Sequence, residues 1–330
     1  MKTEICLTVD VEFSIAGAFG RPDIYSPIGE QSVMCEVDGR SEGLGCLIDI
    51  LDEYETKATF FVDTAQSVYF GEQPMGAIAN AIAQHGHDIQ LHLHPCWMTF
   101  KDSSWKTKKN FHPSDSCAGR TDQEMDEFIS HGLDTFAKWQ LPRPIALRCG
   151  NFMADNTTYR AMRRAGLTLA SNVALGTGES AIVAANGRFR VEGIIEVPCF
   201  AYRTPSFKKN SEVNWRHMSI TSTSRWEIND LLWRARRESV ETIVVLLHPF
   251  ELIKKDNFRY ENIRPNFRNR ARLTGLLDFV RDNSSDFYIT TFGAREKDWA
   301  EVGDLSSKSI VTSYFKAIAR MTENFINDRM

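Results

Sequence analysis

The chain has 330 residues, enough for one large α/β domain or two small ones with a sizeable buried core. Its formal net charge of −4 gives no reason to expect nucleic-acid binding, and no apolar stretch approaches the length of a membrane-spanning helix. Seven cysteines without CxxC spacing, and an N-terminus without the apolar run of a secretory signal, indicate a reducing compartment. The sequence therefore predicts a cytoplasmic protein.

The first predicted strand, residues 5–13, is apolar at its start and carries two acids near its end. Asp10 and Glu12 are two residues apart and therefore lie on the same face of the strand. Buried carboxylates need partners, so a cation, an arginine or water must serve them. The alternative is that the strand has already ended and both acids are solvated.

Strands and helices alternate through the next part of the chain. Apolar periodicity and capping residues predict helices at 41–55, 75–84, 121–139 and 156–165, and strands at 58–62, 88–94, 145–148 and 167–171. A long loop after Pro95 contains four large aromatic residues, which suit either a platform for a sugar ring or a local core. They are Trp97, Phe100, Trp105 and Phe111.

The strand at 88–94 alternates strictly between apolar and polar residues. His92 and His94 share one face, so both imidazoles could bind a single metal ion. Pro95 ends the strand, because proline cannot donate to a ladder, and the histidines therefore lie at its C-terminal end. The alternative is a pair of edge histidines that face water.

The second half of the chain adds a predicted hairpin at 180–200, a surface loop at 206–223 and a helix at 224–239. The apolar strand at 241–247 ends at His248. A basic stretch at 254–272 is typical of a solvated face, with a phosphate-bearing substrate as the alternative. From Ser307 an amphipathic helix is expected to dock on the domain or on a second copy of the chain, which would make a homo-oligomer.

The alternation of strands and helices implies a mainly parallel sheet or barrel with helices outside. Parallel strands place all their C-terminal ends on one face, where sites are built. Polar residues at these ends are the candidates for the site: Asp10, Glu12, His92, His94, Arg148 and His248. We expect one barrel domain over residues 1–300 and a C-terminal helical extension over 301–330.

Carboxylates and two histidines suit a borderline divalent cation such as zinc. A bound cation polarises a carbonyl oxygen and lowers the pKa of its water. A spare carboxylate, which Arg148 could pair with, could accept a proton from that water, and a protonated His248 could donate one to the leaving nitrogen. These parts make a metal-assisted hydrolase that acts on an amide or ester.

Four short motifs follow one another along the chain: Thr8-Val9-Asp10-Val11-Glu12, Gly86-His87-Asp88 with His92 and His94-Pro95, Arg148-Cys149-Gly150, and Leu246-Leu247-His248-Pro249. Together they resemble the ordered motifs of the polysaccharide deacetylases, over roughly residues 4–293. The resemblance implies an irregular, incomplete (β/α) barrel. It also implies removal of acetyl groups from N-acetylated sugars with a divalent metal, usually zinc.

By motif position, Asp10 matches the family's catalytic base, Arg148 the arginine that orients it, and His248 the general acid. Glu12 would stand in for the family's metal-binding aspartate, and His92 matches its first metal histidine. The family usually has adjacent aspartates, whereas here a valine separates two acids, so the roles of Asp10 and Glu12 could be exchanged.

Other departures concern the second metal histidine and the later motifs. The family's second metal histidine usually lies four residues after the first, and this chain has Cys96 at that position. We expect His94 instead, because strand alternation places it beside His92, with a Cys96 thiolate as the alternative. The third motif lacks its proline, and no aspartate-tryptophan motif occurs around residues 198–200. These departures leave room for another substrate or a lost activity.

A cytoplasmic member of the family would act on a precursor, such as a nucleotide- or lipid-linked amino sugar in surface-polysaccharide synthesis. Two other functions remain open. One is hydrolysis of a cyclic amide or ureide by a related barrel enzyme. The other is a catalytically degenerate barrel that binds a glycan through Trp97, Trp105 and their neighbours.

Overall fold

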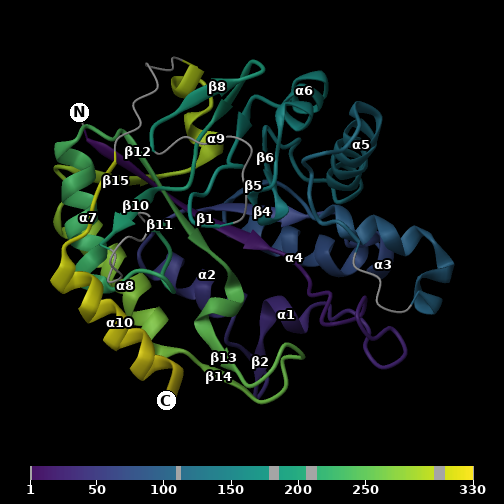
Figure 1. Ribbon diagram of the computed structural model, residues 1–330, viewed down its shortest axis with the longest axis horizontal. Helices are drawn as coiled ribbons and strands as arrows, with labels where there is room; N and C mark the ends of the chain where they lie inside the picture. The colour runs from purple at the N-terminus through teal and green to yellow at the C-terminus, as the bar shows by residue number, and fades with distance from the viewer. Residues whose placement is uncertain (1, 109–112, 178–185, 206–213, 301–308, 330) are drawn as a thin grey trace.

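A curled sheet forms the centre of the molecule, and helices surround it (Figure 1). The computed structural model describes residues 2–108, 113–177, 186–205, 214–300 and 309–329. Within them the sheet has nine strands. They are β1 (Thr3–Val11), β4 (Thr59–Asp63), β5 (Asp88–Leu93), β6 (Ala146–Cys149), β7 (Leu169–Ala170), β8 (Phe189–Val191), β9 (Ile194–Glu196), β12 (Thr242–Leu247) and β15 (Phe287–Thr290).

The strand order is β12-β1-β4-β5-β6-β7-β9-β8, and β15 pairs with the start of β1. All pairs are parallel except β8 with β9. Beyond β9 the chain returns to the free edge of β12 through single bridges, Cys199 with Val244 and Ser219 with Leu246. The protein is therefore an irregular, incomplete (β/α) barrel, as the resemblance to the polysaccharide deacetylases implies.

Helices α2, α4, α5, α6 and α7 lie where the apolar periodicity predicts them, although α2 is shorter than expected. Helix α8 includes part of the basic stretch. Thr121 and Glu124 form the capping box that starts α5. The helices are α1 (Gln31–Met34), α2 (Leu44–Glu53), α3 (Ser67–Phe70), α4 (Gln73–Gln84), α5 (Asp122–Lys138), α6 (Asn156–Arg164), α7 (Arg225–Arg237), α8 (Phe267–Asp282), α9 (Phe292–Arg295) and α10 (Tyr314–Arg329).

The aromatic loop after β5 folds into two short 3₁₀ helices, η1 (Pro95–Lys101) and η2 (Ser103–Thr107). Trp97, Phe100 and Trp105 are buried and pack on one another and on Tyr69. These three residues therefore form a local core and not a platform for a sugar ring, because their rings contact other side chains. Phe111 lies outside the described residues.

The predicted surface loop at 206–223 is wrong in part. Residues 214–217 form β11 (Asn214–His217), which pairs antiparallel with β10 (Ala201–Thr204). The pairing depends on cross-strand contacts such as the Arg203 guanidinium over the Trp215 ring, which no alternation in the polar segment indicates. Residues 206–213 lie outside the described part of the chain.

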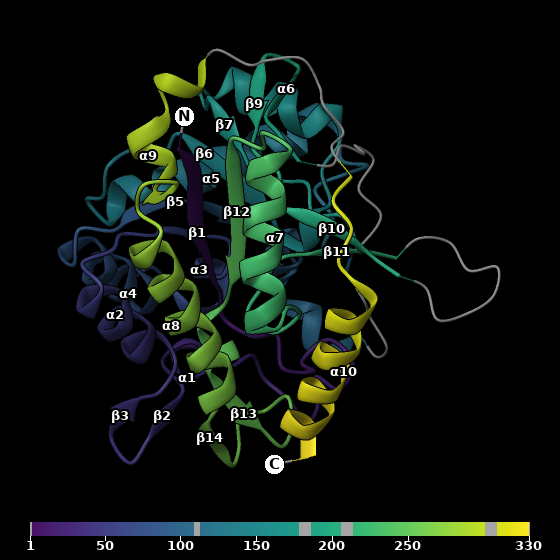
Figure 2. The same ribbon diagram turned by 90° about the vertical axis from the view of Figure 1, so that its left-hand side faces the viewer.

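Two further hairpins lie near α1 at one end of the molecule (Figures 1 and 2). One consists of β2 (Glu36–Val37) and β3 (Arg40–Ser41), and the other of β13 (Ile253–Lys255) and β14 (Ile263–Pro265). The C-terminal strand ends of the barrel point toward this end, because β1 runs from the N-terminus toward it in Figure 2.

The C-terminal helix α10 is present but starts later than Ser307. Before it, residues 309–313 are extended, and Ile310 and Thr312 bond to the backbone of Arg203. The helix then lies against α7 at the edge of the body (Figure 2). The predicted domain boundary at residue 300 stays a prediction, since residues 301–308 are not described.

Helix α10 faces the body with polar groups. Arg320 donates to Glu227 Oε1 at 2.7 Å, and Arg272 donates to Asn324 Oδ1 at 2.7 Å. Its exposed side chains are mostly apolar: Tyr314, Phe315, Ile318, Met321, Phe325 and Ile326. Among the described residues, no helix combines the length and apolarity needed to cross a bilayer.

Candidate active site

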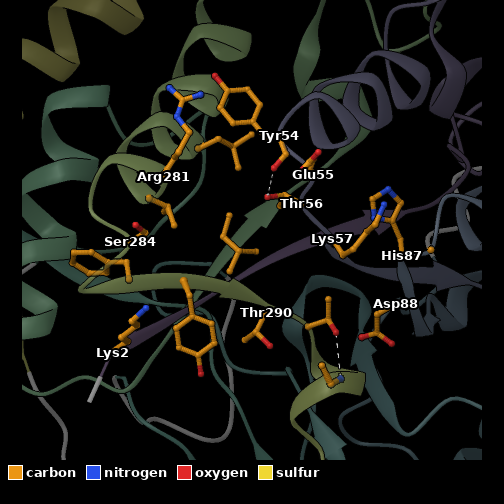
Figure 3. Close-up of a pocket in the computed structure, with 18 of the residues that line it drawn as sticks. Lys2, Tyr54, Glu55, Thr56, Lys57, His87, Asp88, Arg281, Ser284 and Thr290 are labelled. Carbon is orange, nitrogen blue, oxygen red and sulfur yellow. Dashed lines mark hydrogen bonds between the residues drawn. The ribbon is translucent and has the colours of Figure 1, made fainter.

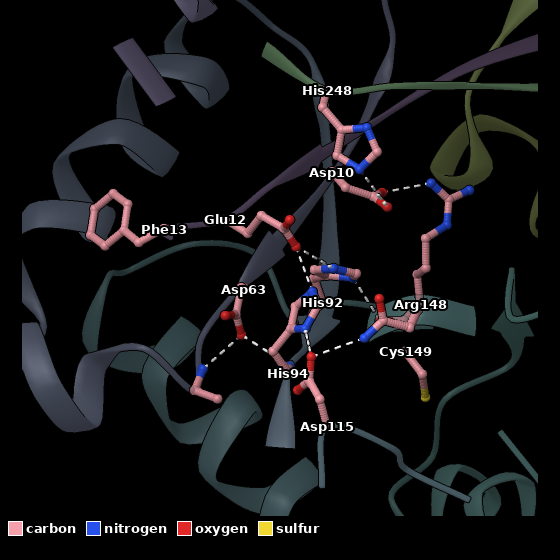
Figure 4. Close-up of polar contacts among 12 residues, drawn as sticks. Asp10, Glu12, Phe13, Asp63, His92, His94, Asp115, Arg148, Cys149 and His248 are labelled. Carbon is pink, nitrogen blue, oxygen red and sulfur yellow. Dashed lines mark hydrogen bonds and ion pairs between the residues drawn. The ribbon is translucent and has the colours of Figure 1, made fainter. Parts of the chain in front are cut away.

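The predicted site residues meet at the C-terminal ends of the parallel strands (Figure 4). Asp10 is the second-last residue of β1, and Glu12 directly follows the strand. His92 lies within β5 and Arg148 within β6. His94 and His248 directly follow β5 and β12. Residues that are distant in sequence come together because parallel neighbours end at the same edge of the sheet.

Glu12 lies between His92, in β5, and His94, which directly follows that strand. Its Oε2 is 3.3 Å from Nε2 of His92 and 2.5 Å from Nε2 of His94. The Nδ1 of His92 faces the carbonyl oxygen of Arg148 at 2.8 Å, which fixes its proton on Nδ1. Nε2 of His92 therefore carries the lone pair that could bind a metal ion. The possible ligand atoms of Glu12, His92 and His94 lie within 4.8 Å of one another.

His94 is held from its other side by an acid that the sequence did not indicate. Its Nδ1 lies 2.6 Å from Oδ2 of Asp115, which also accepts from Asn151. The second oxygen of Asp115 accepts from the backbone N–H of Cys96. A carboxylate behind a histidine fixes the orientation of the ring and strengthens it as a ligand.

Charge and burial oppose each other at this cluster. Burial works to raise the pKa of the Glu12 carboxyl, but the charge and hydrogen bonds of His94 and His92 leave this pKa well below its ordinary value. Burial likewise disfavours the protonated form of His94, yet Glu12 and Asp115 raise its pKa well above the ordinary value. Positive charge is therefore concentrated next to the Glu12 carboxylate, at the place that a bound metal cation would take.

Cys96, the alternative ligand, is buried next to the same cluster, and its Sγ can group with His94 and Asp115. Burial raises the pKa of its thiol, and the charge of Asp115 raises it further. A thiol in these surroundings resists conversion to the thiolate that binds metals. This environment favours His94 over Cys96.

Asp10 is paired with Arg148 in the interior of the barrel. Arg148 Nη1 donates to Asp10 Oδ1 at 2.6 Å, and Nη2 donates to Thr8 Oγ1 and Ser171 Oγ. The guanidinium also lies over the ring of Phe61, 4.2 Å from its centroid. Arg148 thus fixes one oxygen of Asp10 and leaves the other free.

That other oxygen, Oδ2, lies 3.9 Å from Nε2 of His248. On its far side His248 is held by Glu251, whose Oε1 is 3.0 Å from Nδ1. Burial alone would lower the pKa of His248, but the hydrogen bond and charge of Glu251, with the charges of Asp10 and Glu12, raise it to about 9. Sequence analysis missed Glu251, although its place three residues after a candidate histidine is a usable signal.

Asp63, at the end of β4, is a further buried acid beside the cluster (Figure 4). Its Oδ1 accepts from the backbone N–H of Ala65 and His94, and its Oδ2 has no partner among the described residues. Burial raises its pKa to about 6. The strand-end rule that identified the other candidates applies equally to Asp63.

A cavity of about 270 Å³ opens beside Glu12 and His94. Its lining includes Asp115, Trp97, Phe250, Lys255 and Tyr260. A larger cavity, of about 890 Å³, is lined by residues at the opposite ends of the strands, among them Lys57 and Asp88 (Figure 3). Glu12 and His94 line the smaller cavity, whereas none of the six predicted site residues lines the larger one.

Comparison with protein families gives a match between residues 35–170 and the family described as polysaccharide deacetylase. The resemblance to the polysaccharide deacetylase family is confirmed. The matched segment includes β4, β5 and β6, and with them His92, His94 and Arg148. The motifs at residues 8–12 and 246–249 lie outside the matched segment. None of the curated proteins matches the sequence.

Solved structures of similar shape have low sequence identity to the chain. A structure assigned as a polysaccharide deacetylase from Mycobacterium smegmatis has 16% identity, 90% coverage of both chains and a TM-score of 0.49. A family 4 acetyl xylan esterase from Clostridium thermocellum, in complex with cobalt, has 14% identity and a TM-score of 0.42, with 94% of this chain and 100% of that chain covered. A family 4 carbohydrate esterase from Streptomyces lividans has 12% identity and a TM-score of 0.40, with 86% and 90% covered.

Proposed function

We propose that this protein is a metal-dependent hydrolase that removes the acetyl group from an N-acetylated amino sugar or glycan precursor. The observation that carries the proposal is the position of Glu12 between the Nε2 atoms of His92 and His94. Both imidazoles have their Nδ1 atoms held by acceptors, so their free nitrogens converge on one point. Such convergence is typical of a metal site.

The donor set fits a divalent cation, and zinc best. Two imidazole nitrogens and one carboxylate make three protein ligands, the number that catalytic zinc sites use. Glu12, His92 and His94 would hold the ion. When bound, the ion supplies polarisation of the acetyl carbonyl and a more acidic water.

Asp10 is proposed as the general base. Arg148 holds Oδ1, so Oδ2 is the atom that accepts the proton of the attacking water. The contacts argue against an exchange of roles with Glu12, because Glu12 is bonded by both histidines whereas the contacts of Asp10 are with Arg148 and His248.

His248 is proposed as the general acid. Its pKa of about 9 keeps it protonated at neutral pH, and Nε2 faces the same space as Asp10 Oδ2. As the C–N bond breaks, Nε2 gives its proton to the amine of the sugar, and acetate leaves. Glu251 positions the ring at Nδ1 throughout.

We place the reaction in the cytoplasm, on a precursor of a surface polysaccharide. The support is that all seven cysteines are free and buried, which suits a reducing compartment. The family match supports an acetylated sugar as the substrate. Recovery of the protein from the periplasm would contradict this placement.

Elemental analysis of the purified protein tests the central assignment. We expect one divalent ion per chain in the wild type and loss of that ion in His92→Ala, because a ligand is removed. His85→Ala is the matched control, since His85 is an exposed histidine bonded to Asp52. Full metal content in His92→Ala would rule out the proposed ligand set.

A parallel assay measures acetate release from N-acetylated amino-sugar oligomers and hydrolysis of a cyclic amide. Turnover of the oligomers supports the proposal. Turnover of the ring alone would favour the related amide hydrolase. Sugar binding without turnover by the metal-loaded protein would favour a degenerate glycan-binding barrel.

A further inference from the structure

We infer that Lys255 binds an anionic group of the substrate, a carboxylate or a phosphate ester, next to the acetylated position. The inference rests on the proposed function and narrows its substrate to acidic sugars. It concerns a residue of the basic stretch that the fold does not use.

Most cations of the basic stretch are bonded to other groups of the chain. Arg270 bonds Glu42 at 2.5 Å, Arg272 bonds Glu323 at 3.0 Å and Arg264 bonds Asp256 at 3.3 Å. Lys254 donates to the backbone carbonyl of Asn327 in α10. The prediction of a solvated face is wrong for Arg270 and Arg272, whose guanidinium groups are largely buried, whereas Arg264 and Asp256 are both exposed.

Lys255 differs from its neighbours. Within the described part of the chain, its ammonium group has no carboxylate within ion-pair distance. It lies over two aromatic rings instead, 3.9 Å from the centroid of Tyr260 and 5.1 Å from that of Phe250. Rings attract a cation but leave its hydrogens free to donate, so this ammonium group is oriented without being neutralised.

The position of Lys255 links the site to a second cavity. Lys255 and Phe250 line the cavity of about 270 Å³ beside Glu12, and both also line an adjoining cavity of about 660 Å³. A substrate with its acetyl group beside Glu12 and its remainder in the adjoining cavity of about 660 Å³ would pass Lys255.

The adjoining cavity of about 660 Å³ suits the rest of a sugar substrate. Three amide side chains line it: Asn266, which caps α8, Asn269 in the first turn of α8, and Asn324 from α10. Each already makes one bond within the protein and has further donors or acceptors. Amides can both donate to and accept from sugar hydroxyls. The C-terminal helix therefore contributes a wall to this cavity.

The charged residues that line the two cavities indicate that the substrate is acidic. Glu12 and Asp115 are the acids that line the smaller cavity, and in the proposed function Glu12 and His94 bind the metal ion while Asp115 holds His94. Glu251 and Asp256 line the adjoining cavity, where Glu251 pairs with His248 and Asp256 with Arg264. Among the described residues, Lys255 is therefore left at the junction of the two cavities without an ion pair. A charge-assisted bond to a carboxylate or phosphate is the interaction that such a group makes most strongly.

The test compares Lys255→Met with the wild type, because methionine keeps an unbranched apolar chain over the rings and removes the charge. The substrates are a neutral N-acetylglucosamine oligomer, an oligomer of equal length that carries a carboxylate, and an N-acetylglucosamine phosphate ester. We expect KM for an anionic substrate to rise about tenfold with little change in kcat, and KM for the neutral oligomer to stay within about twofold.

The carboxylate and phosphate arms show which anion is recognised. Lys106→Met is the matched control, since Lys106 also lies over an aromatic ring, that of Trp105, but lines neither cavity. An equal rise in KM for neutral and anionic substrates would overturn the inference, because it would indicate a packing role.

Failure of the proposed function is distinguishable from failure of this inference. If the metal-loaded wild type turns over none of the substrates, calorimetric binding of the same three sugars replaces KM. Weaker binding of the anionic sugar by Lys255→Met alone would then uphold the role of Lys255. Equal binding by both proteins would refute it.

Discussion

Arg148 donates from Nη1 to Oδ1 of Asp10 at 2.6 Å, a bond that joins β6 to β1 across 138 positions of sequence. Both side chains are buried, and the guanidinium is also bonded to Thr8 and Ser171. A buried ion pair is costly to break by removing one partner, because the other charge remains without compensation. The pair therefore ties the position of the proposed base to the stability of the barrel.

Replacement of this guanidinium is expected to destabilise the protein. We expect Arg148→Met to lower the free energy of unfolding by about 3–5 kcal/mol, since the buried Asp10 loses its guanidinium partner. Urea denaturation followed by circular dichroism measures the change. Arg164→Met, which breaks an exposed pair with Asp126, is the control and should cost about 1 kcal/mol or less. Equal costs in the two variants would contradict this account of the pair.

Removal of the proposed base should separate folding from catalysis. Asp10→Asn keeps an oxygen that accepts from Arg148 but cannot take a proton from water at neutral pH. We expect a folded protein that retains its metal and loses about 10²- to 10⁴-fold in kcat. Thermal unfolding, elemental analysis and acetate release measure the three properties. Turnover close to that of the wild type would show that another group is the base.

The pairing of His248 with Glu251 predicts the alkaline limb of the pH profile. The pKa of His248 is raised to about 9, so the proton that it donates is present below that pH and is lost above it. We therefore expect kcat/KM to fall as the pH rises through about 9. Steady-state rates between neutral and alkaline pH measure this limb.

Glu251→Gln tests the cause of that shift. The amide keeps the size of the side chain but removes the negative charge, so the alkaline limb should move to lower pH by about one unit or more. Glu127→Gln, on the exposed part of α5, should leave the profile unchanged. A limb that stays at the same pH in Glu251→Gln would mean that another group controls it.

The outer face of α10 predicts self-association. Tyr314, Ile318, Met321 and Phe325 follow the alternating three- and four-residue spacing of paired helices, and Phe315 beside them is 84% exposed. We expect the wild type to form an oligomer that Phe315→Glu or Met321→Glu dissociates, because a buried charge at a helix interface is unfavourable.

Sedimentation equilibrium over a range of concentrations measures that association. The exposed Gln123→Glu change on α5 is the control for added charge alone. A wild type that stays monomeric at all concentrations would refute the expectation. Binding of that monomer to phospholipid vesicles would assign the face to a membrane surface instead.

The strand-end residues show how far local pattern reaches. His92 and His94 are predictable because alternation on a strand has a period of two, and Asp10, Arg148 and His248 because parallel strands end at one edge. The same rule covers Asp63, which follows an apolar strand in the same way. Periodicity and caps likewise placed most of the helices.

The acid behind His94 was beyond such reasoning. Asp115 comes from the segment after the aromatic loop, and it reaches His94 because Trp97, Phe100 and Trp105 pack into a local core. No periodicity links position 115 to position 94. The polar segment that contains β11 was misread for a related reason, since its partner β10 is set by cross-strand contacts.

The sequence by itself determined the alternation of strands and helices and the polar residues at the strand ends, because these depend on periods along the chain. The incomplete barrel was implied by the resemblance of its motifs to a known family. Only the tertiary structure decided how the charges are paired: Glu12 with two histidines, His248 with Glu251, and Lys255 with aromatic rings instead of an acid. The reason is that pairing depends on distance in space, and loops of irregular path bring these groups within reach of one another.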